Sequence, residues 1–337
     1  MSDYRALVCS RLGHWSGLAI GRVPRPALRA GQVRLRVRHA GVGFAVSLFV
    51  SGQYQRKLPL PFTPGTEAAG EILEVAPDVS HLQPGQRVIA ALDWGAFGEE
   101  AVATAETTYP LPDTVALASA AALPITYGTA WGALEWRAQL QPGETLLVHG
   151  ASGGLGMAAV QIGRLMGARV IATASTGQKR ALALANGAHA ALDTDAGALA
   201  AAVKDLCGGS GADVVFDPVG GDLFDASLRC VATGARVLPV GFAAGRPAQV
   251  PTNLLLVKNV SVIGFNYGHY IGWGLRDERK RHAPAVQAAV GQVLRAIGDG
   301  RMPAPTTQHF PFERWLEAID TTMTRRSVGK VILDVDA

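Results

Sequence analysis

Residues 146–156 read LLVHGASGGLG, a stretch in which four glycines follow an apolar run. The run that leads into it, TLLV, is typical of a buried strand, and GLGMAAVQIGRLMGA after it is typical of an apolar helix. Ala151, Gly153 and Gly156 match a dinucleotide-binding fingerprint with alanine in the first position. Small residues there allow a tight turn, close approach of a pyrophosphate, and contact of helix with strand. The stretch predicts a nucleotide cofactor at a helix N-terminus, the alternative being a packing turn without a ligand.

The surrounding sequence alternates strand-like and helical patterns. RVIATA, DVVFDPVG, ARVLPVG and VSVIGF are strand-like, and GQKRALALANGA is a helix that ends in glycine. Such alternation predicts right-handed βαβ units and a doubly wound parallel sheet, an α/β Rossmann domain over about residues 123–264. Before it, short apolar runs with period two and frequent glycine and proline predict a β-rich domain over residues 1–122.

The residues after the second strand of the Rossmann pattern predict which nicotinamide cofactor binds. An NAD site usually has an acidic residue about 20 residues beyond the loop, which binds the ribose 2′-hydroxyl. This chain instead has Ser175, Lys179 and Arg180 there, which favours the 2′-phosphate of NADPH. As alternatives, Ser175 with Gln178 matches a helix capping box, and the two cations belong to a solvated helix face.

Charge and composition favour a soluble enzyme over a nucleic-acid-binding protein. The 337 residues carry a formal net charge of +4, and no apolar run is long enough for a membrane helix. We expect the basic excess on a solvated strand face (Arg34, Arg36, Arg38) and in a mixed-charge surface segment (276–281). The N-terminus lacks a signal-peptide pattern and the three cysteines are widely spaced, so we expect a cytoplasmic protein.

No pattern predicts a metal site. The cysteines have no metal-ligand spacing, and Thr66 precedes Glu67 where a histidine ligand would be expected. The remaining candidate ligands are single histidines, which we expect to be structural: His14, His39, His81 and His149. Zinc-assisted alcohol chemistry is therefore not expected, and neither is covalent catalysis, because no nucleophile stands beside an evident base.

Seven segments together resemble one family, the zeta-crystallin-like, zinc-free quinone oxidoreductases of the medium-chain dehydrogenase/reductase superfamily. They are GVGFAVSLFVSGQY, PLPFTPGTEAAGEI, ALPITYGTAW, VHGASGGLG, VLPVGF, NLLLVKNVSVIGF and RRSVGKVIL, in the family's order along the chain. The resemblance implies a GroES-like catalytic domain, an inserted Rossmann domain, and a return to the first domain over residues 265–337. It also implies NADPH as cofactor and a homodimer.

The resemblance also assigns residues. It implies that the nicotinamide lies near Tyr54 and Thr129, and near the later residues Gly241, Phe242, Phe265 and Asn266. It also implies that Arg325 lies near the adenosine phosphate. For the aromatic residues, packing in a core is the alternative. The local motif and the resemblance together give these expected cofactor residues: Thr129, Ser152, Gly153, Gly154, Leu155, Gly156, Ser175, Lys179, Arg180, Gly241, Phe242, Phe265, Asn266 and Arg325.

Two positions depart from the family pattern on the acceptor side. Gly43 stands where the family commonly has asparagine, and Val46 where it has aspartate. We expect these changes to make the acceptor site roomier and more apolar. We predict hydride transfer to a quinone or an α,β-unsaturated carbonyl without a metal, with Tyr54 as first and Tyr127 as second candidate proton donor.

Two other functions stay open. The chain could reduce an enoyl- or acrylyl-CoA, in which case the basic segment 279–281 would bind CoA phosphates. It could also be a non-catalytic NADPH-binding protein, an alternative that the loss of the asparagine and aspartate favours.

Overall fold

The structure is a computed structural model that describes residues 3–335. The chain forms two compact units. Unit 1 consists of Met1–Gly128, Gly268–Gly300 and Ala304–Ala337, and unit 2 of Thr129–Tyr267 and Arg301–Pro303. Unit 1 is therefore assembled from segments on both sides of unit 2 in the sequence.

The main sheet of unit 1 is built around β3, because this long strand pairs on both of its edges. Its order is β14-β15-β3-β4-β5-β7, and β6 also pairs with β3. Buried Val33, Leu35 and Val37 alternate along β3, as the period-two pattern predicts. The strands of this sheet are β3 (Gln32–Val42), β4 (Glu67–Val75), β5 (Arg87–Ala91), β6 (Glu100–Thr104), β7 (Thr108–Pro110), β14 (Thr307–Pro311) and β15 (Lys330–Asp334).

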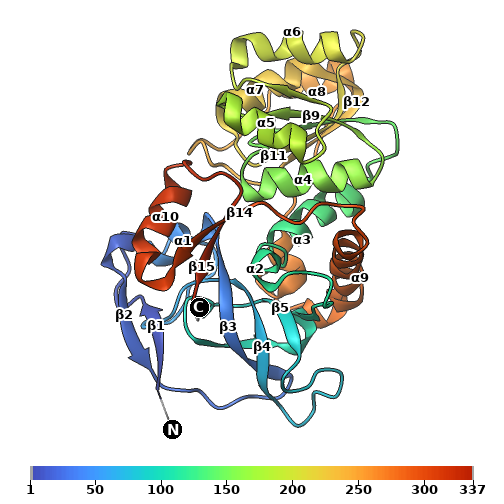
Figure 1. The fold of residues 1–337 in the computed structure, drawn as a ribbon. Coiled ribbons are helices and arrows are strands. Elements are labelled where there is room, and N and C mark those ends of the chain that lie inside the picture. The colour runs from blue at the N-terminus through green and yellow to red at the C-terminus, as the bar shows by residue number, and fades with distance from the viewer. Residues whose placement is uncertain (1–2, 336–337) are drawn as a thin grey trace. The chain divides into compact units, whose positions relative to one another are not determined.

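Short helices and a second small sheet complete unit 1. The antiparallel pair β1 (Tyr4–Val8) and β2 (Ala19–Val23) forms the small sheet. Figure 1 shows α10 beside β14 and β15, which it contacts. The α-helices of unit 1 are α1 (Ala45–Val50), α2 (Leu117–Ala120), α9 (Arg279–Gly298) and α10 (Trp315–Met323), and α3 (Thr126–Trp131) begins there. Single-turn helices lie at η1 (Trp15–Gly17), η2 (Ala105–Thr107), η4 (Tyr267–Ile271) and η5 (Phe312–Arg314).

Unit 2 contains a fully parallel sheet in the order β10-β9-β8-β11-β12-β13. Its central strands are buried apolar runs, as expected for a sheet covered on both faces. This is the doubly wound order expected of a dinucleotide-binding domain. The strands are β8 (Thr145–Val148), β9 (Arg169–Thr173), β10 (Ala190–Leu192), β11 (Ala212–Asp217), β12 (Val231–Pro239) and β13 (Ser261–Val262).

Helices connect these strands, and Figure 1 shows α4 and α6 on opposite sides of the sheet. Gly163 of α4 packs directly against the side chain of Leu146 in β8, so α4 lies close to the strand that precedes it. The helices of unit 2 are the π-helix η3 (Gly132–Arg137), α4 (Gly154–Leu165), α5 (Gly177–Ala185), α6 (Ala196–Leu206), α7 (Gly221–Cys230) and α8 (Thr252–Lys258).

Between residues 3 and 335, no helix has the length and apolar character needed to cross a bilayer. Cys9, Cys207 and Cys230 are free thiols. The expected β-rich domain and parallel α/β domain are both present, so the predicted fold class is confirmed. The strand expected over VSVIGF is shorter than predicted, since β13 contains Ser261 and Val262 alone.

Two arginines predicted to lie on solvated surfaces are buried. Arg34 is 6% exposed, and its guanidinium contacts Glu74 and the carbonyl of Pro26. Arg279 is 7% exposed, although the sequence around it is highly charged. The expectation of a wholly solvated charged face is wrong at both positions, because each guanidinium reaches carboxylates and carbonyls inside unit 1.

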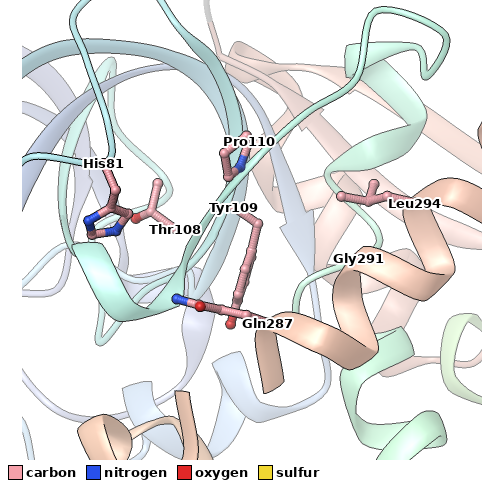
Figure 2. Close-up of a pocket in the computed structure, with 7 residues that line it drawn as sticks. All are labelled: His81, Thr108, Tyr109, Pro110, Gln287, Gly291 and Leu294. Atoms are coloured by element: carbon pink, nitrogen blue, oxygen red, sulfur yellow. The ribbon is translucent and has the colours of Figure 1, made fainter. Parts of the chain in front are cut away.

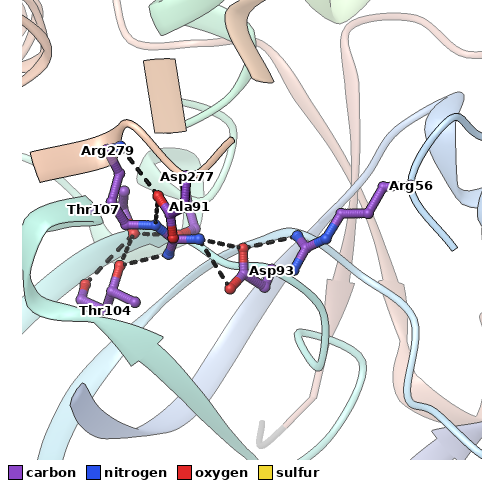
Figure 3. A network of polar contacts seen from close by, with 7 residues as sticks. All are labelled: Arg56, Ala91, Asp93, Thr104, Thr107, Asp277 and Arg279. Carbon is purple, nitrogen blue, oxygen red and sulfur yellow. Dashed lines mark hydrogen bonds and ion pairs between the residues drawn. The ribbon is translucent and has the colours of Figure 1, made fainter. Parts of the chain in front are cut away.

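Arg279 fixes the start of α9 to the sheet of unit 1. Its Nη2 lies 2.9 Å and 3.1 Å from the two oxygens of Asp93, and its Nε lies 2.9 Å from Asp277. Its Nη1 donates to Thr104 at 3.0 Å, and Arg56 binds the same Asp93 carboxylate from the other side. Figure 3 shows Asp93 between the two guanidinium groups.

We expect Arg279→Ala to destabilise unit 1 by about 3 kcal/mol, because it leaves part of a buried ion network without its cation. Exposed Lys280 is the matched control, and Lys280→Ala should change stability by about 0.5 kcal/mol or less. Urea unfolding with a unit 1 tryptophan as probe measures both. Equal midpoints for the two variants would contradict the anchoring role of Arg279.

Candidate functional site

The glycine-rich loop after β8 has a geometry suited to a phosphate group. Gly150 adopts a left-handed φ of 59°, and a Cβ on Gly156 would overlap the carbonyl of Gly150. The first helical hydrogen bond of α4 runs from the Met157 N–H to the Gly153 carbonyl. The N–H groups of the residues between them, Gly154 to Gly156, therefore have no acceptor within the helix and are available to an anion.

The topology places this loop where a doubly wound sheet binds its ligand. β8 pairs with β9 on one side and with β11 on the other. The chain leaves β8 toward β9 and later returns to β11, so the connections run in opposite directions from this point. Ligands bind outside the carboxyl ends of the strands at such a switch point. The loop predicted from residues 146–156 thus lies at the expected edge of the sheet.

His149, directly before the loop, is a buried structural residue. It has no exposed surface, its Nδ1 lies 3.0 Å from Thr173 Oγ1, and its Nε2 lies 2.6 Å from Ser227 Oγ. Because the Ser227 hydroxyl donates to the Leu223 carbonyl, Nε2 carries the proton and Nδ1 accepts from Thr173. Burial lowers the pKa of His149, and the charge of Asp217 opposes this shift. The neutral ring connects β8, β9 and α7.

The segment after β9 holds the residues predicted to bind the 2′-phosphate. Ser175 is exposed, and Thr176 is the N-cap of α5, since its Oγ1 accepts from the Lys179 N–H at 3.2 Å. The predicted capping box with Ser175 is therefore wrong by one residue, and the Ser175 hydroxyl is not the cap. Arg180 binds the Ala174 carbonyl and Asp193, so its guanidinium is already held within unit 2.

The segment after β12 approaches the end of β11. The Val240 N–H donates to the Asp217 carbonyl at 2.8 Å, and a Cβ on Gly241 would lie 3.1 Å from the Pro218 carbonyl oxygen. Glycine at 241 thus lets two strand ends come together. Phe242 is 43% exposed, so the alternative of a plain core aromatic is wrong for this residue.

Phe265 has a packing role within unit 2. Its ring lies 6.5 Å from that of Trp136, edge to face, and a Cβ on Gly132 would lie 2.5 Å from its Cζ. Asn266 follows it and is exposed. Thr129 lies half-buried in α3.

The two candidate proton donors belong to unit 1 and differ in accessibility. Tyr54 follows α1, stacks on Phe49 at 4.1 Å between ring centroids, and is half-buried. Burial raises its phenol pKa, and the charge of Arg56 opposes the shift. Tyr127 is 2% exposed, and burial raises its pKa far above the ordinary value. Tyr54 is the better placed of the two to meet a ligand.

Arg325, predicted to lie near the adenosine phosphate, follows the end of α10. It is exposed and has a left-handed φ of 58°. This backbone conformation turns the chain toward Gly329 and β15.

The two acceptor-side departures from the family pattern follow β3, Gly43 directly after the strand and Val46 in α1. Val46 is 3% exposed and belongs to the hydrophobic core of unit 1, so it does not enlarge an open site. Gly43 is half-buried, and Phe44 beside it is 43% exposed. The expectation of a more apolar acceptor site is therefore wrong for Val46, whose side chain packs inward with α1.

A buried ion pair below Gly43 escaped the sequence reasoning. Lys330 Nζ lies 2.5 Å from Glu67 Oε1, and both residues are at most 8% exposed. The other oxygen, Glu67 Oε2, accepts from the Ile125 N–H at 3.1 Å. Both residues stand in segments that resemble the family, but pairing of residues 263 positions apart has no local signal.

The described residues contain two groups that could hold a metal ion, and neither includes Glu67. One joins His39, His309 and Asp334, where both rings contact the same carboxylate oxygen, at 2.7 Å and 2.8 Å. The expectation that His39 stands alone is wrong, because β3, β15 and β14 are neighbours. The other joins His269, Glu278 and His282.

The pocket in Figure 2 is not a site for the predicted chemistry. It has a volume of about 190 Å³ and lies between β7 and α9, lined among others by Tyr109 and Gln287. None of the residues predicted for cofactor or acceptor lines it. Its volume is also below the range usual for small-molecule sites.

Two family profiles match the chain. One, described as alcohol dehydrogenase GroES-like domain, covers residues 29–113, and one, described as zinc-binding dehydrogenase, covers residues 154–281. The first match lies in unit 1, which confirms the expected GroES-like domain.

Full-length relatives also match. The chain is 39% identical over 335 residues to quinone oxidoreductase-like protein 2 of Bos taurus, covering 99% of this chain and 93% of that protein. It is 33% identical over 312 residues to the quinone oxidoreductase of Rattus norvegicus, covering 91% and 90%. A mycobacterial protein solved in complex with NADPH matches with a TM-score of 0.88 and 30% identity, covering 98% and 99%.

Alanine at two loop glycines should have different effects. Gly156→Ala places a Cβ against backbone, so we expect a loss of about 1–3 kcal/mol of stability together with loss of NADPH binding. Gly153→Ala meets its nearest atom at 3.5 Å, so the fold should survive while the added methyl group weakens binding. Thermal unfolding and fluorescence titration with NADPH separate the two effects. Equal stability of both variants would contradict the close approach at Gly156.

The buried His149 should make stability pH-dependent. Its folded pKa is lowered, so its contribution is complete above the unfolded value of about 6.5 and is lost as pH falls below it toward the folded pKa. We expect His149→Gln, which keeps a polar side chain, to flatten the fall in stability between about pH 6.5 and 5 relative to wild type. Urea unfolding across this range is the measurement. Parallel curves would show that the ring is not held neutral.

Proposed function

The chain belongs to the quinone oxidoreductase family of the medium-chain dehydrogenases/reductases, and on that premise we propose that it transfers a hydride from NADPH to a quinone or an α,β-unsaturated carbonyl. That it is an NADPH-dependent oxidoreductase follows from its relatives. The observation that carries the proposal is the loop at residues 150–156, which presents helix N–H groups at the switch point of a doubly wound sheet.

The cofactor is NADPH, as the sequence predicted. We infer that its pyrophosphate meets the N–H groups of Gly154, Leu155 and Gly156, with Ser152 and Gly153 in the same loop. Its 2′-phosphate is assigned to Ser175 and Lys179, because β9 is followed by a hydroxyl and a cation and not by an acid. Arg180 stabilises this segment, because its guanidinium binds Asp193 and the Ala174 carbonyl. Arg325 is assigned to the adenosine phosphate.

We propose that the acceptor is a quinone or an enone that takes the hydride without a metal ion. Bound NADPH supplies the hydride. A quinone becomes an aromatic oxyanion that water can protonate, and an enone becomes an enolate that gains from a nearby donor. We assign Tyr54 of unit 1 as the proton donor, with Tyr127 as the second candidate. The residues assigned to the nicotinamide are Gly241, Phe242, Phe265, Asn266 and Thr129.

The observations favour this acceptor class over a CoA thioester. The case for CoA rested on the basic segment 279–281. Arg279 is buried and bound to Asp93, Asp277 and Thr104, and Arg281 lies 3.4 Å from Glu278. Arg279 is therefore engaged within unit 1, whereas the Arg281 side chain is 75% exposed. An enoyl-CoA acceptor is the alternative that the acceptor panel tests directly.

We also propose a homodimer in the cytoplasm. The edge strand β13 of unit 2 is preceded by α8, where Leu256 and Val257 are 79% and 78% exposed. An edge strand beside exposed apolar residues is suited to pairing with a second copy. Light scattering of wild type and of Leu256→Glu tests this, with a monomeric variant as the expected result.

Lys179→Ala tests the cofactor assignment. We expect the affinity for NADPH to fall about 10- to 100-fold, because a charge-assisted contact with the 2′-phosphate is lost. NADH lacks this phosphate, so its affinity should not change. Lys204→Ala, an exposed lysine on α6, is the control. Binding titrations with both cofactors measure this, and equal losses for NADPH and NADH would contradict the assignment.

A panel of quinones, enones and enoyl-CoAs then tests the reaction itself. Oxidation of NADPH well above that of NADH, with quinones or enones preferred, is the expected result. Binding of NADPH without turnover on any acceptor would contradict the proposed activity and favour the non-catalytic alternative.

A further inference from the structure

Three neighbouring strands of unit 1 bring a buried charge pair beneath Gly43. In the antiparallel pairing of β15 with β3, Val331 faces Val42 and Ile332 faces Gly41. One residue further, Lys330 is therefore across from Gly43. On the other side of β3, Ala40 faces Ala68, which places Glu67 beside Gly41. Lys330 and Glu67 thus lie on either side of the end of β3, opposite positions two residues apart.

Gly41 is what allows the two charges to meet across a strand. A Cβ at this position would lie 2.6 Å from Cγ and from Oε1 of Glu67. The Glu67 side chain therefore passes over the bare backbone of β3 to reach Lys330 on β15. Gly329 has a similar role before Lys330, because a Cβ there would overlap the Thr306 carbonyl and its φ is 81°. The fold thus requires glycine at two positions around this pair, Gly41 and Gly329.

The pair is not explained as a contribution to stability. Removing two charges from water costs several kcal/mol per ion, and apolar residues of similar volume often stabilise a protein as well or better. Glu67 is fully satisfied, with one oxygen on Lys330 and the other on the Ile125 N–H. The ammonium has three N–H donors, and the Glu67 carboxylate takes one of them.

The ammonium faces an open space at Gly43. A Cβ built on Gly43 would have one neighbour within 4 Å, the Lys330 Nζ, at 3.6 Å. The position that a side chain would fill is therefore open, and the Lys330 ammonium lies next to it. The resemblance implies that Gly43 lies on the acceptor side, and Gly43 has no side chain to cover the ammonium.

We propose that Lys330 Nζ, uncovered by Gly43 and held by Glu67, is an oxyanion site that binds the carbonyl oxygen of the acceptor. This inference rests on the proposed function and names the group that stabilises its product. The ammonium donates N–H bonds to the oxygen on which negative charge develops during hydride transfer. A preorganised donor in a site shielded from water is worth far more there than in solution.

With an enone, the proposed reaction is a conjugate reduction, in which NADPH donates two electrons as a hydride. The hydride adds to the β-carbon of an enone, the π electrons move to the carbonyl oxygen, and NADPH becomes NADP⁺. The enolate oxygen accepts a hydrogen bond from Lys330 Nζ, and water then delivers a proton to the α-carbon. A quinone takes the same two electrons and leaves a hydroquinone anion, whose negative charge is spread over an aromatic ring. An enone therefore depends more on the ammonium than a quinone does.

Two variants remove the site in different ways. Lys330→Met alone would leave the Glu67 carboxylate buried and unpaired, so the double variant Lys330→Met with Glu67→Gln removes both charges and keeps the volumes. Gly43→Ala keeps the ion pair and fills the open position, and its Cβ would be in ordinary contact at 3.6 Å. Lys280→Met, an exposed lysine of unit 1, is the control.

Single-turnover oxidation of bound NADPH by an enone and by a benzoquinone is the first measurement. In both variants we expect the rate with the enone to fall by about 10²–10³, the effect of losing one oxyanion donor, with a clearly smaller fall for the quinone. The affinity for NADPH should stay at the wild-type value. Unchanged enone rates would overturn the proposal, and so would equal losses on both acceptors together with weaker NADPH binding, which would place Lys330 on the cofactor.

A second measurement does not depend on turnover. 4-Nitrophenol, added to the NADP⁺ complex, mimics the anionic product, and its phenolate has a distinct absorbance. Wild type should bind the phenolate form and lower the apparent pKa of the ligand more than either variant does. If wild type and the double variant titrate the ligand identically, Lys330 is not an oxyanion site. If the shift is present but no acceptor is reduced, the site stands and the proposed reaction fails.

Discussion

Gly156 approaches the carbonyl of Gly150 so closely that no side chain fits between them. This contact starts α4 directly above the end of β8, and it leaves the N–H groups of the first turn facing outward. The rest of unit 2 supports the same arrangement. Gly163 lets α4 pack against Leu146 of β8. The neutral His149, directly after β8, bonds to Thr173 of β9 and Ser227 of α7. A phosphate site thus follows from how tightly a helix and a strand can pack.

In unit 1, glycine likewise allows a close approach, here between a backbone and a charged pair. Gly41 removes the side chain that would separate Glu67 from Lys330, and Gly43 removes the one that would cover the ammonium. In both units, glycine is needed where backbone must lie directly against another group, a carbonyl at Gly156 and a carboxylate at Gly41. Functional groups follow directly from these contacts. The cofactor anion meets N–H groups in unit 2, and the acceptor oxygen is proposed to meet a cation in unit 1.

The buried arginines of unit 1 show why charge in the sequence is a poor guide to exposure. Arg279 lies among five other charged residues, yet its guanidinium is bound by Asp93 and Asp277 within the unit. A buried guanidinium is tolerated when its donors are matched by carboxylates in good geometry. A guanidinium that completes an internal network, as that of Arg279 does, is not available to a ligand phosphate. The absence of an acid after β9, by contrast, is a local feature and remains informative about the cofactor.

The sequence by itself determined the parallel α/β domain, the cofactor loop and the NADPH preference, because each depends on residues within about 30 positions of one another. Hydrophobic period and glycine spacing are local signals, and β8, α4 and β9 follow them closely. The cap at Thr176 in place of Ser175 was missed because both residues have a hydroxyl, and backbone geometry selects between them. Only the tertiary structure decided that Val46 packs into the core, that His39 meets His309, and that Lys330 meets Glu67 beneath Gly43. Those outcomes depend on which strands become neighbours in the sheet of unit 1, and the pairing of β15 with β3 joins residues almost 300 positions apart, beyond the reach of any local pattern.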